Sequence, residues 1–162
     1  MVHHFDRSQQ FCIRLLGHHA TDSATVHDRQ AWFAALHREA VEYLQLNEVA
    51  HAGVHDVPAW HIYPHVAVWA AESVESPGYV GWWVLCGDCP TDYAPCTGDR
   101  TPRAAVEEIA ARWREAAAFL ADGHQHPDFD VEGSTRAVEV APLLDARARV
   151  LEKYLADDSV WG

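Results

Sequence analysis

Two apolar segments separated by a turn constrain the fold of this 162-residue chain more than any other feature. Residues 66–72 and 79–86 are rich in valine, alanine and tryptophan, and Ser76-Pro77-Gly78 between them is typical of a turn. Neither segment alternates apolar with polar residues, so we expect both strands to be covered on both faces. The sequence therefore predicts a central antiparallel hairpin.

Three segments, at about 26–46, 102–122 and 142–156, have the apolar periodicity of amphipathic helices. The second is the clearest, because Thr101 is a good N-cap and Gly123 is a typical helix stop. Three helices packed with a small antiparallel sheet make an α+β fold.

The remaining segments are harder to assign. Glycine and proline make residues 51–64 look irregular, and we expect residues 87–93 to form a charged loop. A two-stranded sheet is only marginally stable, so we expect either a third short strand, at about 136–141, or a homodimer that pairs sheet edges. No repeat or linker is visible. We therefore predict one α+β domain over 25–162, preceded by a histidine-rich N-terminal arm or short helix at 1–24.

The composition is strongly acidic, with 24 Asp and Glu residues against 12 Lys and Arg residues and a formal charge of −12. Such a surface repels phosphate backbones and anionic lipids, so we expect neither nucleic acid nor membrane as a partner. A basic protein is the partner that this charge favours, although acidity can also serve solubility alone. The N-terminus has no basic region followed by an apolar stretch, and we expect a cytoplasmic protein.

The segment from Gly81 to Tyr93 carries a family resemblance. Gly81-Trp82-Trp83 leads into Gly87-Asp88-Cys89-Pro90-Thr91-Asp92-Tyr93, which resembles a small bacterial family of unknown function. The helix at 101–122 and a later His-Pro-Asp-Phe segment at 126–129 are also similar to that family, over about residues 30–155 in all. The family pattern does not require a cysteine at position 89. The resemblance therefore implies no chemistry and counts against a metal site shared across the family.

The predicted loop at 87–93 offers carboxylate, hydroxyl and phenol groups directly after an apolar strand. Loops at strand ends often carry binding residues, because the strands hold them in place. We expect Asp88, Thr91, Asp92 and Tyr93 to contact a partner, with both carboxylates facing solvent. The alternative is that these residues only stabilise a turn, since Asp and Thr are good turn formers and tyrosine can bury its ring.

A zinc site is the alternative use of this region. Cys86 and Cys89 have C-x2-C spacing, and Cys96 with His126 would complete a tetrahedral set. Against it, only one such pair is present and Cys86 continues an apolar strand, where buried thiols are common. We therefore expect no cofactor. His61 and His65, which flank Tyr63-Pro64, carry no assignment.

Two functional hypotheses remain. The sequence contains no G-x-S-x-G elbow, phosphate-binding glycine loop, H-E-x-x-H motif or dinucleotide fingerprint, and we assign no catalytic residue. We favour a non-enzymatic acidic binding protein, such as an immunity or antitoxin-type inhibitor of a basic bacterial toxin domain. Trp82 and Trp83 should point to opposite faces of their strand, and the outward ring would join the contact. The alternative is an enzyme, or a small-ligand or metal-binding protein, that uses residues 87–93 with His126.

Overall fold

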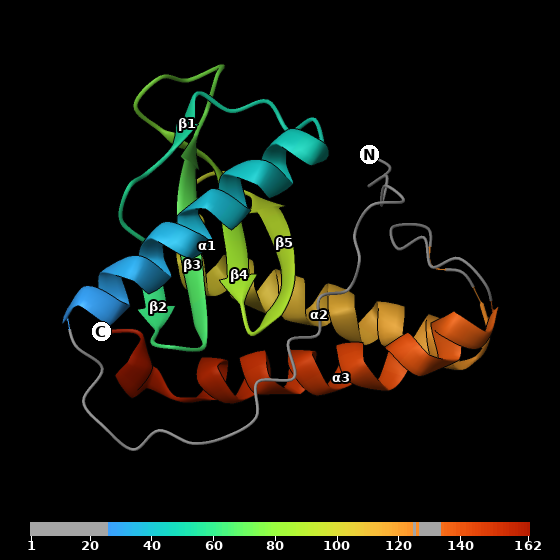
Figure 1. Ribbon diagram of the computed structural model, residues 1–162. Helices are drawn as coiled ribbons and strands as arrows, with labels where there is room; N and C mark the ends of the chain where they lie inside the picture. Colours follow the sequence, from blue (N-terminus) through green and yellow to red (C-terminus); the bar gives the residue numbers. More distant parts are fainter. Residues whose placement is uncertain (1–25, 125, 127–133) are drawn as a thin grey trace. The chain divides into compact units, whose positions relative to one another are not determined.

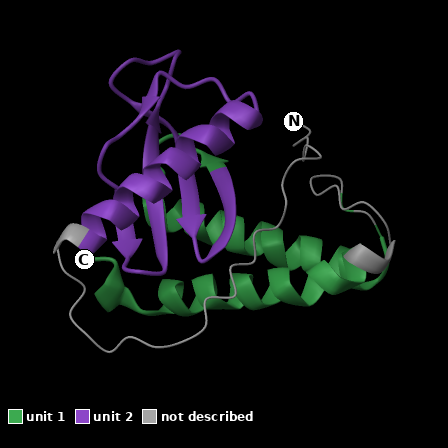
Figure 2. Cartoon of the chain, viewed as in Figure 1, with its two compact units in different colours: residues 1–6, 94–162 green, residues 7–93 purple. Residues whose placement is uncertain are grey.

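The computed structural model describes residues 26–124, 126 and 134–162 of the chain. These residues fall into two compact units, which Figure 2 colours separately. We call residues 26–93 the sheet unit and the described residues from 94 onward the helical unit. The expected arm at 1–24 lies outside the described residues, and the expectation of one domain over 25–162 stays a prediction.

The predicted hairpin is confirmed and forms the centre of the sheet unit. Strands β3, Val66–Glu72, and β4, Val80–Gly87, pair antiparallel from Val66 opposite Gly87 to Ala71 opposite Trp82. A bulge then shifts the register between Ala71 and Glu72. The connecting loop is closed by a hydrogen bond from Ser73 N–H to the Tyr79 carbonyl at 2.8 Å.

Three further short strands extend the hairpin into a five-stranded sheet of order β1-β3-β4-β5, with β2 also paired to β3 (Figure 1). They are β1, Gly53–Val54, β2, Trp60–Ile62, and β5, Cys89–Pro95. Residues 51–64 are therefore not wholly irregular. The expected loop at 87–93 is wrong, because a single residue, Asp88, separates β4 from β5. The sequence underestimated β5 because its prolines and Asp92 are poor strand formers.

Helix α1, Val26–Leu46, confirms the first predicted helix and packs on one face of the sheet. Leu36, Ala40 and Leu44 form its buried stripe. The opposite residues of the hairpin are buried as well, including Val68, Trp83 and Leu85, so both strands are covered on both faces as expected. The core on the α1 side contains Leu36, Ala40, Tyr43, Leu44, Ala67, Trp69, Ala71, Val84, Cys86 and Tyr93.

The helical unit consists mainly of two long helices that run side by side, α2, Pro102–Ala121, and α3, Ser134–Ala156 (Figure 1). The start of α2 is as predicted, because the Thr101 hydroxyl accepts a hydrogen bond from the Ala104 N–H at 3.3 Å. Its buried stripe includes Ile109 and Trp113. The helices are also joined by ion pairs, such as Arg114 with Asp145 at 2.6 Å.

Helix α3 begins eight residues earlier than the predicted 142–156. Pro142 lies inside the helix, where its ring is exposed, while Ala137, Val140 and Ala141 continue the buried stripe. Burial of these side chains outweighs the hydrogen bond that proline cannot donate. The third strand proposed at 136–141 is therefore wrong, because those residues are helical.

The chain ends in a short 3-10 helix, η1, Asp158–Val160, which is attached to the start of α2. Arg103 donates to the Leu155 carbonyl at 2.7 Å, pairs with Asp158 at 2.6 Å and lies over the Trp161 ring. None of the helices in the described part of the chain combines the length and apolar character needed to cross a membrane.

Candidate functional site

Asp88, between β4 and β5, lies against the turn between β2 and β3. Its backbone N–H donates to the His65 carbonyl at 2.7 Å, and its Oδ2 is 3.2 Å from His65 Nδ1. The His65 and Asp88 side chains are 54% and 53% exposed. The structure therefore brings together a predicted contact residue and a histidine that the sequence left unassigned.

Gly87 makes this close approach of the two turns sterically allowed. Its φ is +134°, and a Cβ atom there would lie 2.3 Å from the His65 carbonyl oxygen and 2.9 Å from Val66 Cα. Both obstacles are backbone atoms, which cannot move aside as a flexible side chain can. Only glycine fits at this position, and Asp88 is held beside His65 as a result.

Aromatic rings from α1 meet rings from β2 and from the β2–β3 turn, the turn that also carries His65. The rings of Trp32 and Tyr63 are 5.2 Å apart and nearly perpendicular, and those of Phe33 and His61 are 4.9 Å apart at 89°. Phe33 also contacts the buried Trp69, which anchors the cluster in the core. We call the following residues the Tyr63 surface: Arg29, Trp32, Phe33, His61, Tyr63, His65 and Asp88.

Arg29 places a cation on the Tyr63 surface, with its Cζ atom 5.7 Å from the centre of the Tyr63 ring. Partial burial, followed by this charge, lowers the pKa of His61 below 6.5, so the imidazole is neutral near pH 7. Trp32 and Tyr63 are half-buried, whereas Arg29 and His61 are exposed. The seven residues of this surface combine aromatic rings with two imidazoles, one guanidinium and one carboxylate.

Thr91 is half-buried, and its hydroxyl donates to Glu39 on α1. Burial raises the pKa of Glu39 above 4.5, the nearby charge of Glu42 adds to this rise, and the Thr91 hydrogen bond opposes it. No local pattern in the sequence connects Glu39 with Thr91, which lies 52 residues later. The hydroxyl of the predicted contact residue Thr91 is therefore bonded within the sheet unit.

Asp92 and Tyr93 are buried, with 7% and 6% of their surfaces exposed. Asp92 Oδ1 accepts a hydrogen bond from the Tyr93 N–H at 2.8 Å, and the Tyr93 ring contacts Tyr43 and Trp82. The expectation that both Asp88 and Asp92 face solvent therefore holds only for Asp88. The structural alternative, in which these groups stabilise their own segment, describes Asp92 and Tyr93 better.

Trp82 and Trp83 point to opposite faces of β4, as expected. Trp82 is half-buried beside the core on the α1 side, and its Nε1 donates to the Ala50 carbonyl at 3.0 Å. Trp83 is buried. Neither ring is the exposed tryptophan that the sequence led us to expect beside the acidic turn. The half-buried Trp32, from α1, is the indole on the Tyr63 surface.

In the described part of the chain, the four predicted zinc ligands form no metal site. Cys86 is buried and its Sγ donates to the Leu36 carbonyl; burial raises the pKa of this thiol well above its usual range, and the Glu39 charge adds to the effect. Among the described residues, no three His, Cys, Asp or Glu side chains are placed to hold a metal ion. The expectation of no cofactor stays a prediction.

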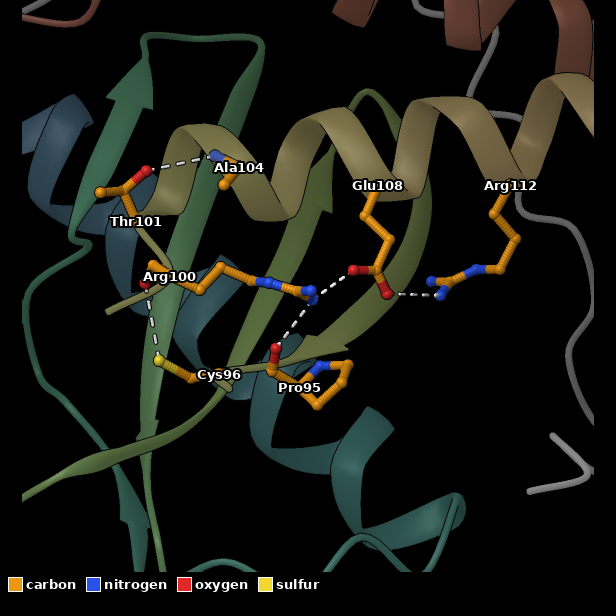
Figure 3. Close-up of polar contacts among 7 residues, drawn as sticks. All are labelled: Pro95, Cys96, Arg100, Thr101, Ala104, Glu108 and Arg112. Atoms are coloured by element: carbon orange, nitrogen blue, oxygen red, sulfur yellow. Dashed lines mark hydrogen bonds and ion pairs between the residues drawn. The ribbon is translucent and has the colours of Figure 1, made fainter. Parts of the chain in front are cut away.

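Of the other three predicted ligands, Cys89 is half-buried at the start of β5, whereas Cys96 and His126 belong to the helical unit. Cys96 Sγ donates to the Arg100 carbonyl in the loop before α2, where Arg100 also bridges the Pro95 carbonyl and Glu108 (Figure 3). His126 is buried, with its ring 5.2 Å from that of Phe119. The small-ligand alternative that combines His126 with residues 87–93 stays a prediction.

The negative charge is divided unevenly between the two units. The sheet unit has nine acidic residues, two arginines and no lysine, a formal charge of −7. The described residues of the helical unit have ten acidic and eight basic residues, a formal charge of −2. In the helical unit, acidic side chains are paired with basic ones, as Asp145 is with Arg114 and Arg149. Four carboxylates of the sheet unit are exposed and have no ion-pair partner among the described residues: Glu42, Glu48, Asp56 and Glu75.

Fold and charge together define a class, an α+β protein in which an acidic sheet unit is followed by a unit of two long helices. The chain belongs to the family described as Domain of unknown function (DUF4826), whose model matches residues 26–161. This agrees with the resemblance seen in residues 81–93. No curated protein and no solved structure matches the chain.

Proposed function

We propose that this chain is a non-enzymatic binding protein that recognises a basic protein partner through its sheet unit. The observation that carries the proposal is the charge of the sheet unit, −7 over residues 26–93 with no lysine. Carboxylates that are exposed and lack internal cations attract a basic surface over several ångströms and accelerate encounter. In its most specific form, the partner is a basic bacterial toxin domain and the chain is its cytoplasmic inhibitor.

The Tyr63 surface is the contact that we assign to this function. It combines an exposed carboxylate, Asp88, with the half-buried rings of Trp32 and Tyr63. Aromatic residues anchor interfaces because they bury a large area with few rotatable bonds, and a carboxylate pairs well with arginine. Asp92 and Tyr93 do not belong to this contact, because they are buried in the fold.

The test is affinity capture on the full-length chain from an extract of its source organism, followed by measurement of the association rate at several ionic strengths. One variant removes four exposed charges of the sheet unit: Glu42→Gln, Glu48→Gln, Asp56→Asn and Glu75→Gln. The matched control removes four exposed charges of the helical unit, which also lack ion-pair partners among the described residues: Glu107→Gln, Glu115→Gln, Asp122→Asn and Glu139→Gln.

We expect capture of a basic protein that rising salt concentrations release. The sheet-unit variant should associate at least about tenfold more slowly at low ionic strength, whereas the control should stay close to the wild type. An equal loss in both variants would show that only net charge matters. Capture of an acidic protein, or of no protein, would also overturn the proposal.

A further inference from the structure

We propose that the Tyr63 surface is a receptor for an arginine side chain of the partner, and that the chain's own Arg29 occupies this receptor in the structure. The inference rests on the proposed function, because it takes the partner to be basic. It adds the chemical group that is recognised, the residues that recognise it and a competing group within the chain.

The position of Arg29 is the first observation. Its guanidinium lies over the Tyr63 ring, with Cζ 5.7 Å from the ring centre, which is within the range of a cation–π contact. Trp32, one turn further along α1, meets the same ring almost at a right angle, with 5.2 Å between the ring centres. The surface therefore already binds a guanidinium beside perpendicular rings.

The surroundings favour a cation rather than an anion. His61 has its ring centre 6.4 Å from that of Trp32, and it is neutral near pH 7, so it does not repel a second positive group. Asp88 is half exposed and is held by His65, two residues after Tyr63 in the same turn. Asp88 is the carboxylate that we assign to the remaining N–H groups of a bound arginine.

Guanidinium fits this surface better than an ammonium group does. It is planar, stacks on aromatic rings and loses less hydration on doing so than the compact lysine head group. Its N–H groups also form a fork that matches a carboxylate such as Asp88. The internal occupant is itself an arginine, and the sheet unit contains no lysine.

Within the described part of the chain, one weak contact holds Arg29, so we expect it to be displaceable. The residue is exposed, it lies in the first turn of α1, and among the described residues its contact is with the Tyr63 ring. An exposed cation–π contact is weak. The partner's arginine can therefore replace Arg29 on the Tyr63 ring, and other contacts made by the partner favour this exchange. Arg29 therefore lowers the apparent affinity of the surface by the fraction of time that it covers the ring.

The experiment titrates acetyl-arginine amide into the full-length ¹⁵N-labelled protein and follows the Trp32 indole N–H signal, which is assigned with a Trp32→Phe variant. Acetyl-citrulline amide, a neutral isostere, is the ligand control. Arg29→Ala opens the Tyr63 ring. Arg38→Ala removes the same charge from another exposed position of α1 and is the matched control variant.

We expect the arginine compound to shift the Trp32 signal and the citrulline compound to leave it in place. Arg29→Ala should bind the arginine compound about two- to fivefold more tightly than Arg38→Ala does. Tyr63→Phe, which keeps the ring, should retain binding, whereas Tyr63→Leu should lose it with the far-ultraviolet circular dichroism unchanged. Equal affinity in Arg29→Ala and Arg38→Ala, or equal shifts by both compounds, would overturn the inference.

The two proposals fail separately, because this titration needs no partner. If a basic protein is captured through the sheet-unit carboxylates and arginine does not bind at Tyr63, the inference alone is wrong. If arginine binds at Tyr63 and no basic protein is captured, the surface exists and the proposed function is wrong.

Discussion

Replacement of Gly87 by alanine is the sharpest test of how the fold positions Asp88. The new Cβ would lie 2.3 Å from the His65 carbonyl oxygen and 2.9 Å from Val66 Cα, whereas real Cβ atoms do not come within 3.0 Å of such neighbours. Because both obstacles are backbone, the β4–β5 turn must move away from the β2–β3 turn. The movement breaks the 2.7 Å hydrogen bond from Asp88 N–H to the His65 carbonyl.

The size of the effect follows from these two losses. A non-glycine residue held at φ +134° costs about 1–3 kcal/mol. Loss of the backbone hydrogen bond costs about 0.5–1.5 kcal/mol more. Alanine also lowers the conformational entropy of the unfolded chain, and this stabilises the folded protein by about 0.4–1 kcal/mol. From the midpoints of these ranges, we expect Gly87→Ala to lower the free energy of unfolding by about 2 kcal/mol.

Urea unfolding of the full chain, followed by far-ultraviolet circular dichroism, measures this free energy. Gly53→Ala is the matched control, because Gly53 is also a strand residue but has no heavy atom within 4 Å of the position its Cβ would take. That variant should be unchanged or more stable by up to about 1 kcal/mol. If Gly87→Ala unfolds at the same urea concentration as Gly53→Ala, the argued contact of the two turns is wrong.

Three further predictions concern stability. Because burial raises the pKa of Glu39, the folded chain binds a proton there more tightly than the unfolded chain does. Wild-type stability therefore falls as the pH rises from 4.5 through the raised pKa, and Glu39→Gln should remove this fall. A constant difference in unfolding free energy between the two proteins across that pH range would contradict the argument. Thr101→Ala should lower the unfolding free energy by about 1 kcal/mol in thermal melts, and Thr101→Ser should restore most of it. Pro142→Ala should stabilise α3 by about 1–3 kcal/mol, and a lower melting temperature would show that the ring makes a favourable contact.

The elements that the sequence predicted well are those whose patterns are local. The hairpin and the helices at 26–46 and 102–122 follow from runs of apolar residues and from caps that lie within a few positions of each other. The start of α3 was missed because a proline usually marks the first turn of a helix, and only packing against α2 shows that Pro142 lies inside one. Strand β5 was missed because its pairing with β4, rather than its own residues, makes it a strand.

The candidate site depended on contacts over longer distances along the chain. Asp88 could be found from turn chemistry alone, but its partner His65 precedes it by 23 residues. A signal was present, because counting outward from the predicted turn at Ser76-Pro77 places Val66 opposite Gly87. The contact of α1 with the β2–β3 turn left no such signal, since no pattern relates Arg29 to Tyr63. The negative charge of residues 26–93 can be counted from the sequence. The boundary between the two units after Tyr93 cannot be read from it.

The different positions of Asp88 and Asp92 change how the acidic segment must be understood. In the sequence the two carboxylates look equivalent, yet Asp92 is buried and accepts a hydrogen bond from the Tyr93 N–H, while Asp88 is half exposed. A single carboxylate gives little affinity or selectivity at a surface in water. The proposed recognition at this end of the sheet unit therefore needs more than Asp88. The groups that we assign to it are the rings of Trp32 and Tyr63, with Arg29 over the Tyr63 ring.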